Sequence, residues 1–272
     1  MLLGASVGHS PTPLMMGAAF RATGIDAVYQ ALSVGPAEFA SVFESLRESG
    51  VDGMNVTMPY KGTVPPLLDA LDVVSSSVGV VNTIRKEGRG YKGYNTDVYG
   101  IVHPLKSRGI RRVAAAAVLG TGGASRAFVA AMHELGCERL TAISRRPGAS
   151  SAFFADMKRA FPSMGIGSAS VETLGSERFD LFFNASPCGS NGIPIPARLT
   201  RILDRGPTVF DAVYFPVETE LIRQAGERHC PVVYGHEMLL HQGAEGFRIW
   251  TGEAPPLSAM REALMASLEV PA

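Results

Sequence analysis

Lys61 and Asp97 are the two residues whose types and surroundings most directly suggest catalysis. Lysine is rare in this chain, and Lys61 ends a loop without other charges, Thr57-Met-Pro-Tyr-Lys61, that follows a short apolar stretch. Asp97 follows at the predicted start of a helix. Interconversion of an alcohol and a ketone needs a group that exchanges the hydroxyl proton as hydride moves, and a lysine held beside a carboxylate suits this task. Spacing alone leaves the ordinary alternative open, in which Lys61 is solvated and Asp97 only caps its helix.

A glycine-rich loop indicates a second kind of site. The pattern Gly120-x-Gly122-x-x-Ser125 follows the apolar run Val113–Leu119 and leads into a predicted helix through Leu135. Glycine at the first position allows a tight turn, and glycine at the second lets a diphosphate approach the backbone at the positive end of the helix. The flanking strand and helix favour a dinucleotide site over an ordinary strand–helix turn.

The end of the next strand bears on the choice of cofactor. An enzyme that prefers NAD usually carries an acidic residue there for the ribose 2′-hydroxyl. Here the sequence is Ser144-Arg145-Arg146, without a nearby acid. A guanidinium suits a 2′-phosphate through charge-assisted hydrogen bonds, which favours NADP. The alternative is a pair of solvated loop arginines, since the chain is rich in arginine.

The elements that must position these residues alternate between strand and helix patterns, as in α/β proteins. The expected strands are Leu2–Val7, Ala27–Val34, Gly53–Val56, Val80–Ile84, Val113–Leu119, Leu140–Ser144, Phe179–Asn184 and Thr208–Val213. The expected helices include one capped by Thr12 with Pro13 at its first position, then Pro36–Ser49, a stretch through Leu67–Val74, one from Gly235, and Leu257–Leu268. Glu87–Gly90 has the composition of a hairpin turn.

Composition excludes several classes of protein. The chain has 272 residues, of which 46% are apolar and 18% charged, with 25 basic and 25 acidic residues. A neutral balance gives no reason to expect nucleic acid as a partner, and the apolar runs are too short to span a membrane. The N-terminus lacks the features of a signal peptide. Cys137, Cys188 and Cys230 have no metal-ligand spacing, so we expect reduced thiols, no metal and a cytoplasmic location.

Ordered motifs along the whole chain resemble the shikimate dehydrogenase family. The motifs are Gly8-His-Ser-Pro-Thr-Pro13, Gly53-Met-Asn-Val-Thr-Met-Pro-Tyr-Lys61, Gly79-Val-Val-Asn-Thr83, Gly93-Tyr-Asn-Thr-Asp97, Gly120-Thr-Gly-Gly-Ala124, Asn184-Ala-Ser-Pro187, Asp211-Ala-Val-Tyr214, Met238-Leu-Leu-His-Gln242 and Trp250-Thr-Gly252. The resemblance implies an α/β enzyme that interconverts 3-dehydroshikimate and shikimate with NADP(H). It also implies a substrate domain with a mainly parallel sheet over residues 1–98, a Rossmann-like dinucleotide domain over 99–235, and helices in 236–272 that pack back on the first domain.

The same resemblance assigns roles to individual residues. Lys61 becomes the proton-transfer residue and Asp97 its partner. Residues expected to hold the substrate are Ser10, Thr12, Thr57, Asn82, Asp97, Tyr214 and Gln242. Residues expected to hold the cofactor are Gly120, Thr121, Gly122, Gly123, Ala124, Ser125, Ser144, Arg145, Arg146, Ala212, Gly235 and Met238. Hydroxyls and amides in the first set suit a polyhydroxy acid.

Departures from the family pattern keep alternatives open. Thr12 stands where a second serine is usual, as in members that also accept quinate, and Ser144-Arg145-Arg146 replaces the usual Asn-Arg-Thr. The chain could therefore be a paralogue that acts on quinate or an amino-substituted shikimate, with NADP or NAD. A third hypothesis is a binding protein that has lost catalysis, against which the retained Lys61 and Asp97 argue. The oligomeric state is expected to be a monomer or a homodimer.

Overall fold

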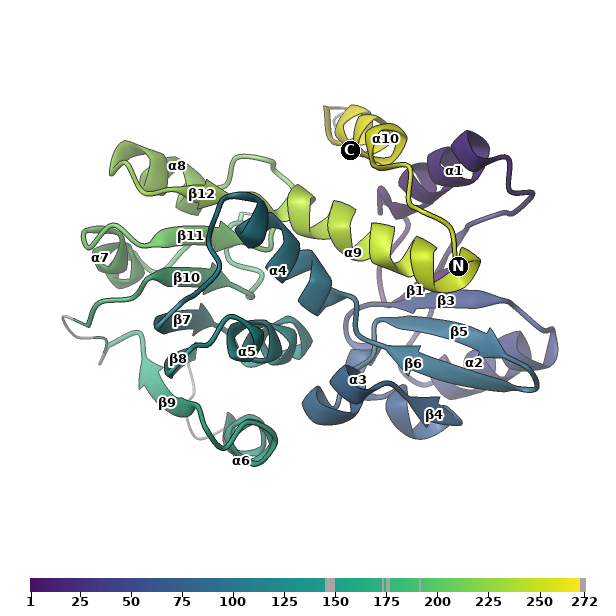
Figure 1. The fold of residues 1–272 in the computed structure, drawn as a ribbon, viewed down its shortest axis with the longest axis horizontal. Helices are drawn as coiled ribbons and strands as arrows, with labels where there is room; N and C mark the ends of the chain where they lie inside the picture. The colour runs from purple at the N-terminus through teal and green to yellow at the C-terminus, as the bar shows by residue number, and fades with distance from the viewer. Residues whose placement is uncertain (145–149, 173, 175–176, 191, 270–272) are drawn as a thin grey trace. The chain divides into compact units, whose positions relative to one another are not determined.

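The chain divides into two compact units, each built around its own sheet of six strands. The computed structural model describes residues 1–272 except 145–149, 173, 175–176, 191 and 270–272. Unit 1 comprises Met1–Asp97 and Leu240–Ala272, and unit 2 comprises Val98–Leu239. Figure 1 shows the order of the elements in each unit. No helix among the described residues is long and apolar enough to cross a membrane.

Unit 1 contains a mixed sheet in the order β2-β1-β3-β5-β6-β4. Its strands are β1 (Leu2–Gly4), β2 (Ala31–Ser33), β3 (Gly53–Val56), β4 (Ala70–Leu71), β5 (Thr83–Glu87) and β6 (Gly90–Tyr94). Its helices are α1 (Thr12–Thr23), α2 (Phe39–Glu48), α3 (Val73–Val78), α10 (Leu257–Glu269), the later part of α9 (Gly235–Thr251), and the 3-10 helices Tyr60–Gly62 and Pro65–Leu67. The neighbours of β1 are parallel to it, whereas β5 runs antiparallel to both β3 and β6.

Strand alternation gives the unit 1 sheet two different faces. Met54 and Val56 join Phe39 and Phe43 of α2 in one apolar core. Because successive side chains of a strand point to opposite faces, Asn55 is directed away from that core. On that side lies α9, whose Trp250 indole N–H donates to the Ile84 carbonyl at 2.9 Å. Asn55 of β3 and Thr83 of β5 are buried on this side of the sheet, next to α9.

Unit 2 is a parallel sheet in the order β12-β11-β10-β7-β8-β9. Its strands are β7 (Ala115–Leu119), β8 (Arg139–Ser144), β9 (Gly165–Ser170), β10 (Leu181–Asn184), β11 (Thr208–Asp211) and β12 (Val232–Val233). Its helices are α4 (Asp97–Ser107, with Asp97 assigned to unit 1), α5 (Gly123–Glu134), α6 (Ser151–Ala160), α7 (Thr200–Leu203), α8 (Glu220–Glu227) and the start of α9, with the 3-10 helix Ala197–Leu199. This is the doubly wound order of Rossmann-like domains, in which the order of the strands reverses between β7 and β10.

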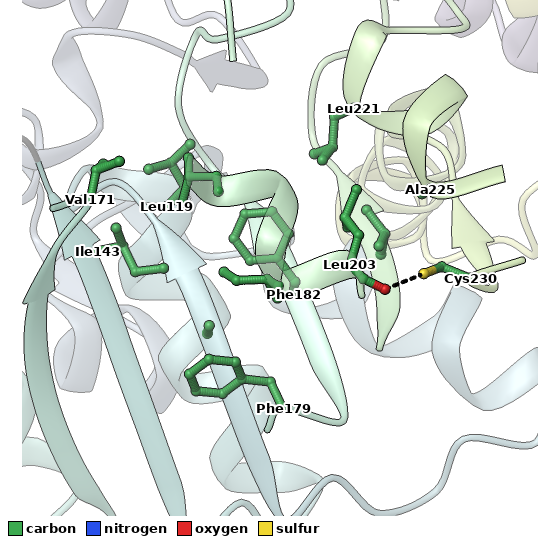
Figure 2. Close-up of a cluster of buried hydrophobic side chains, with 13 residues drawn as sticks. Leu119, Ile143, Val171, Phe179, Phe182, Leu203, Leu221, Ala225 and Cys230 are labelled. Atoms are coloured by element: carbon green, nitrogen blue, oxygen red, sulfur yellow. Dashed lines mark hydrogen bonds between the residues drawn. The ribbon is translucent and has the colours of Figure 1, made fainter. Parts of the chain in front are cut away.

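The core of unit 2 explains why β7 reads as an uninterrupted apolar run. Leu119, Ile143 and Phe182 come from three neighbouring strands and pack in one buried cluster with Leu203 and Leu221 (Figure 2). A parallel sheet covered on both faces needs apolar side chains on both sides of each strand. Both sheets confirm the expected α/β class.

Several expected elements differ in detail. Thr12 does not cap its helix: Pro11 occupies the N-cap position without a side-chain cap, and Thr12 is the first helical residue. The strand expected over Ala27–Val34 is paired only over Ala31–Ser33. The stretch Leu67–Val74 is not one helix, because β4 pairs with β6 and the Asp72 side chain starts α3 by accepting the Ser75 N–H at 2.7 Å. The Glu87–Gly90 hairpin is confirmed.

Candidate active site

The side chain of Tyr60 anchors the loop that carries Lys61. Tyr60 lies in the 3-10 helix that follows β3, and its ring stacks on Phe39 with centroids 4.0 Å apart. Its hydroxyl donates to the Val34 carbonyl. The Lys61 carbonyl in turn accepts the Val81 N–H at 2.9 Å. The backbone of Lys61 and the neighbouring residue Tyr60 are both held by these contacts. The Lys61 side chain therefore extends from a fixed point of the backbone.

Lys61 and Asp97 form an ion pair. The Lys61 ammonium Nζ lies 2.6 Å from Asp97 Oδ2, and the two side chains are 20% and 4% exposed. Asp97 Oδ1 accepts a second hydrogen bond from Asn82 Nδ2 at 2.8 Å. The lysine is thus the more open member of the pair, while the carboxylate is enclosed and oriented from two sides. This arrangement suits a lysine that exchanges a proton with a bound molecule.

Asn82 and Gln242 lie on the enclosed side of this pair. Asn82 Nδ2 is 3.0 Å from Thr96 Oγ1 and 3.4 Å from Gln242 Oε1. Thr96 also donates its backbone N–H to Asn82 Oδ1 at 2.8 Å. Four predicted residues, Lys61, Asp97, Asn82 and Gln242, are therefore joined through hydrogen bonds within unit 1.

The remaining unit 1 residues predicted to hold the substrate lie at the ends of α1 and β3. Ser10 donates its hydroxyl to Thr12 Oγ1 at 3.0 Å and accepts the Thr12 N–H at 3.3 Å. Thr12 is buried, and Ser10 is half-buried. Thr57 follows β3, and its methyl lies so close to β1 that a Cβ on Gly4 would approach it to 2.5 Å. Ser10 and Thr12 follow β1 in the chain and Thr57 follows β3, and these two strands are neighbours in one sheet.

The glycine loop of unit 2 has the geometry of a diphosphate cradle. Gly120 has a φ of 106°, a conformation that favours glycine, and Gly122 is the N-cap of α5. A Cβ on Gly122 would meet nothing within 4 Å, so the backbone there is open to a ligand. Ser125 is fully buried, as close packing of the helix on the strand requires. The first N–H groups of a helix lack intrahelical partners and attract phosphate, so the loop fits a dinucleotide.

The edge of the glycine loop is joined to the segment after β8. Thr121 Oγ1 lies 3.0 Å from Ser150 Oγ. Ser144 is the buried last residue of β8. Arg145 and Arg146, on which the expectation of NADP depends, lie outside the described residues.

Three further residues predicted to hold the cofactor and one predicted to hold the substrate follow β11 or begin α9. Ala212 and Tyr214 come directly after β11, and Gly235 and Met238 lie in the first part of α9. A Cβ on Gly235 would fall 2.3 Å from the Val213 carbonyl oxygen. Glycine is therefore required at position 235, because the start of the helix touches the β11 loop.

The sequence did not single out a buried polar network that holds this loop. Asp211 Oδ1 accepts the Asn184 side-chain N–H at 2.8 Å and the Val213 N–H at 3.0 Å, and Oδ2 accepts the Thr219 hydroxyl at 2.6 Å. Burial raises the pKa of the Asp211 carboxyl to about 6, although these hydrogen bonds oppose the shift. Position in the chain could have indicated this network, since Asn184 and Asp211 are each the last residue of a strand and the two strands end at the same edge of the sheet.

Metal ligands are not grouped in the part of the chain that the structure describes, where no three His, Cys, Asp or Glu side chains could hold an ion. Cys137, Cys188 and Cys230 are free thiols. Cys230 donates to the Leu203 carbonyl at 3.3 Å, as the dashed line in Figure 2 shows.

A Rossmann-like unit with an open glycine loop, together with a second unit that carries a lysine–carboxylate pair, defines a class of nucleotide-dependent enzymes. Comparisons with known proteins identify the family. Residues 2–84 match the model of the shikimate dehydrogenase substrate binding domain, and residues 235–265 match that of the shikimate 5'-dehydrogenase C-terminal domain. The shikimate dehydrogenase (NADP(+)) of Moorella thermoacetica is 38% identical to this chain, and the match covers 100% of this chain and 95% of the Moorella protein.

Solved structures agree with this result. Shikimate 5-dehydrogenase from Thermus thermophilus, in complex with NADP(H) and shikimate, is 30% identical with a TM-score of 0.85, covering 98% of each chain. Quinate dehydrogenase from Corynebacterium glutamicum, in complex with NAD, is 28% identical with a TM-score of 0.88, covering 97% of each chain. The chain belongs to the shikimate dehydrogenase family and is an NAD(P)-dependent oxidoreductase.

Proposed function

We propose that this protein is an NADP-dependent shikimate dehydrogenase in which Lys61 and Asp97 are the catalytic pair. The observation that carries the proposal is the 2.6 Å contact between Lys61 Nζ and Asp97 Oδ2, with the lysine on a loop that is otherwise uncharged. Full-length similarity to shikimate dehydrogenases that use NADP supports the substrate and the cofactor. In this proposal residues 1–98 and 236–272 form the domain that binds the substrate, and residues 99–235 form the domain that binds the dinucleotide.

The chemistry assigned to the pair is proton transfer. In the reductive direction the Lys61 ammonium donates a proton to the ketone oxygen of 3-dehydroshikimate, and the bond between nitrogen and hydrogen breaks as the new hydroxyl forms. In the oxidative direction the neutral amine takes that proton back. Asp97 orients the lysine and accepts a hydrogen bond from a substrate hydroxyl. Holding both groups in place supplies much of the rate acceleration that positioning can give.

The chain's own residues fit the cofactor. Bound NADP(H) supplies or accepts the hydride. Gly120–Ser125 would hold the diphosphate through backbone N–H groups. Ser144, Arg145 and Arg146 are assigned to the cofactor because the two guanidinium groups favour a 2′-phosphate. Ala212, Gly235 and Met238 would complete the set of cofactor-binding residues.

Steady-state assays with purified protein test the proposal. Shikimate and quinate are each offered with NAD and with NADP, and nicotinamide absorbance is followed. We expect the highest kcat/KM with shikimate and NADP. A several-fold preference for NAD would contradict the role given to the arginines, and binding without turnover would contradict the enzyme assignment.

A quinate or aminoshikimate dehydrogenase is the second candidate, and Thr12 is the observation that favours it. The Thr12 side chain is buried and receives the Ser10 hydroxyl, so its extra methyl occupies space that serine would leave open. The likeness to a quinate dehydrogenase structure supports the same alternative. Higher kcat/KM for quinate than for shikimate in the assay above would establish it.

A further inference from the structure

A fully buried hydroxyl lies behind the proposed catalytic pair without touching it. Thr83, the first residue of β5, has no exposed surface. Its Oγ1 accepts a hydrogen bond from Asn55 Nδ2 at 2.9 Å and lies 3.2 Å from Asn82 Oδ1 and 3.0 Å from Thr96 Oγ1. This hydroxyl reaches Asp97 indirectly, because Asn82 donates to Asp97 Oδ1.

The orientation of the Asn82 amide follows from its partners. The Thr96 backbone N–H can only donate, so the atom 2.8 Å from it must be the amide oxygen. The NH2 group then faces Asp97 Oδ1 at 2.8 Å. The reversed amide would place its oxygen against the carboxylate and its NH2 against a second donor. Both of these contacts would be repulsive.

The direction of the hydrogen bonds also fixes the orientation of the Asn55 amide. The backbone carbonyl of Asn82 can only accept, so Asn55 Nδ2, 3.0 Å away, must be the donor. Asn55 Oδ1 is then left to accept from the Tyr29 hydroxyl. Burial raises the pKa of Tyr29, so its hydroxyl keeps its proton and donates. Because Thr83 Oγ1 accepts from Asn55, its own proton goes to Asn82 Oδ1 or to Thr96 Oγ1. The Thr96 hydroxyl lies 3.2 Å from Asn82 Oδ1, so both routes supply donors to that oxygen.

We propose that Thr83 is a positioning residue: with Asn55 and Tyr29 behind it, its hydroxyl holds the Asn82 amide in the one orientation that donates to Asp97 and so aligns Lys61. The proposal rests on the function proposed above for Lys61 and Asp97. It adds Thr83 of β5, Asn55 of β3 and Tyr29, which lies between α1 and β2, as residues that position the pair and do not contact the reacting atoms.

Substitutions at Thr83 test the role of the hydroxyl. Thr83→Val removes it and keeps the shape, Thr83→Ser keeps it and removes the methyl, and Thr83→Ala replaces the valine variant if that variant does not fold. Ser75→Ala is the matched control, since Ser75 is also fully buried and its Oγ has no hydrogen-bond partner among the described residues. We expect kcat of shikimate oxidation to fall about tenfold in Thr83→Val with the KM for NADP unchanged. Thr83→Ser should recover most of the loss, and Ser75→Ala should match the wild type.

A second readout does not depend on turnover. Reductive methylation followed by peptide mass spectrometry reports how accessible Lys61 is, with the exposed residue Lys158 as internal reference. We expect Lys61 to be labelled severalfold faster in Thr83→Val than in the wild type. Wild-type kcat together with wild-type labelling in that variant would overturn the positioning role alone. Absence of shikimate turnover in the wild type would instead contradict the proposed function, and the labelling comparison would still decide the role of Thr83.

Discussion

The charge of Lys61 is placed differently from that of a surface lysine. Its ammonium contacts an enclosed carboxylate, whereas Lys106 pairs with Glu134 at 2.7 Å with both side chains about half exposed. An exposed pair of this kind contributes little, because water and salt screen it. In the Lys61 pair the carboxylate is buried and accepts a second hydrogen bond, from Asn82. The same pairing of a lysine with a carboxylate thus has different consequences at the two sites.

Replacement of Lys61 tests the proton-transfer role. Lys61→Ala should lower kcat by roughly a hundredfold to ten-thousandfold, the range expected for loss of a general acid–base group. Substrate binding should persist, as measured by calorimetric titration with shikimate. Lys106→Ala, which removes the exposed ion pair, should leave kcat unchanged. Near-normal turnover of Lys61→Ala would show that another group transfers the proton.

Thr12 is the residue expected to select between substrates. Quinate has a tetrahedral ring carbon beside its carboxylate where shikimate has a planar one, so a methyl at this place discriminates by shape. Thr12→Ser should lower the ratio of kcat/KM for quinate to that for shikimate by about tenfold, a magnitude typical of one methyl group in a pocket. Thr23→Ser, at the other end of α1, is the control. An unchanged ratio would remove Thr12 from the specificity determinants.

At the scale of elements, close contacts explain which glycines the fold requires. Gly235 begins α9 against the β11 loop, and a Cβ there would fall 2.3 Å from the Val213 carbonyl oxygen. Gly226 lies within α8, where a Cβ would meet nothing within 4 Å. Gly235 is thus needed because two backbone segments approach closely there, whereas Gly226 only lowers the stability of its helix.

Alanine substitutions separate these two glycines. Gly235→Ala should lower the free energy of unfolding by about 1–3 kcal/mol, because overpacking forces the helix away from the loop. Gly226→Ala should raise it by about 0.5–1 kcal/mol, since alanine favours a helix over glycine. Urea unfolding followed by circular dichroism measures both. An equal change in the free energy of unfolding for both variants would mean that the start of α9 accommodates the Cβ without destabilisation.

Much of the fold was predictable from local pattern. The apolar run before Gly120 and the two-residue turn in Glu87–Gly90 both specify elements through nearest neighbours in the chain. Thr12 was assigned wrongly because Pro11 adopts the helical region itself and becomes the N-cap, so the helix starts one residue early. The stretch Leu67–Val74 was misread because pairing of β4 with β6 overrides its helical spacing.

The site was predictable only in part. Motif order indicated Lys61 and Asp97, and their contact in the structure agrees with that pairing while their catalytic role stays a prediction. Asn55 and Thr83 were not identified as parts of the same group, because their proximity depends on the antiparallel register that pairs them across β3 and β5. Register is a property of the folded sheet that neither residue type nor spacing along the chain reveals.

At the scale of the whole molecule, the division between the units falls inside two helices. Asp97 is the first residue of α4 and the last residue assigned to the first segment of unit 1, while α9 continues from Met238 in unit 2 to Gln242 in unit 1. Within unit 2, Arg108 after α4 and Glu237 in α9 are joined by two hydrogen bonds of 2.9 and 2.7 Å. The helices that bear predicted substrate residues are therefore tied to each other at their unit 2 ends.

Stability of the molecule should depend on pH through Asp211. Burial raises the pKa of its carboxyl from 3.8 to about 6, so the native state binds a proton more readily than the unfolded chain does. The native state therefore gains stability as pH falls from 7 to 5, and loses that gain as pH rises through about 6. For a shift of this size the gain is about 1 kcal/mol across that interval.

Asp211→Asn isolates this contribution because the amide does not titrate. Free energies of unfolding from urea at pH 5, 6 and 7 give a slope for each protein, and the wild-type slope minus the variant slope belongs to Asp211. We expect the wild type to gain about 1 kcal/mol more than Asp211→Asn between pH 7 and 5. Asp204→Asn, which removes an exposed carboxylate of the same unit, controls for the loss of one charge. Identical slopes in the wild type and Asp211→Asn would mean that the three donors around Asp211 offset its burial completely.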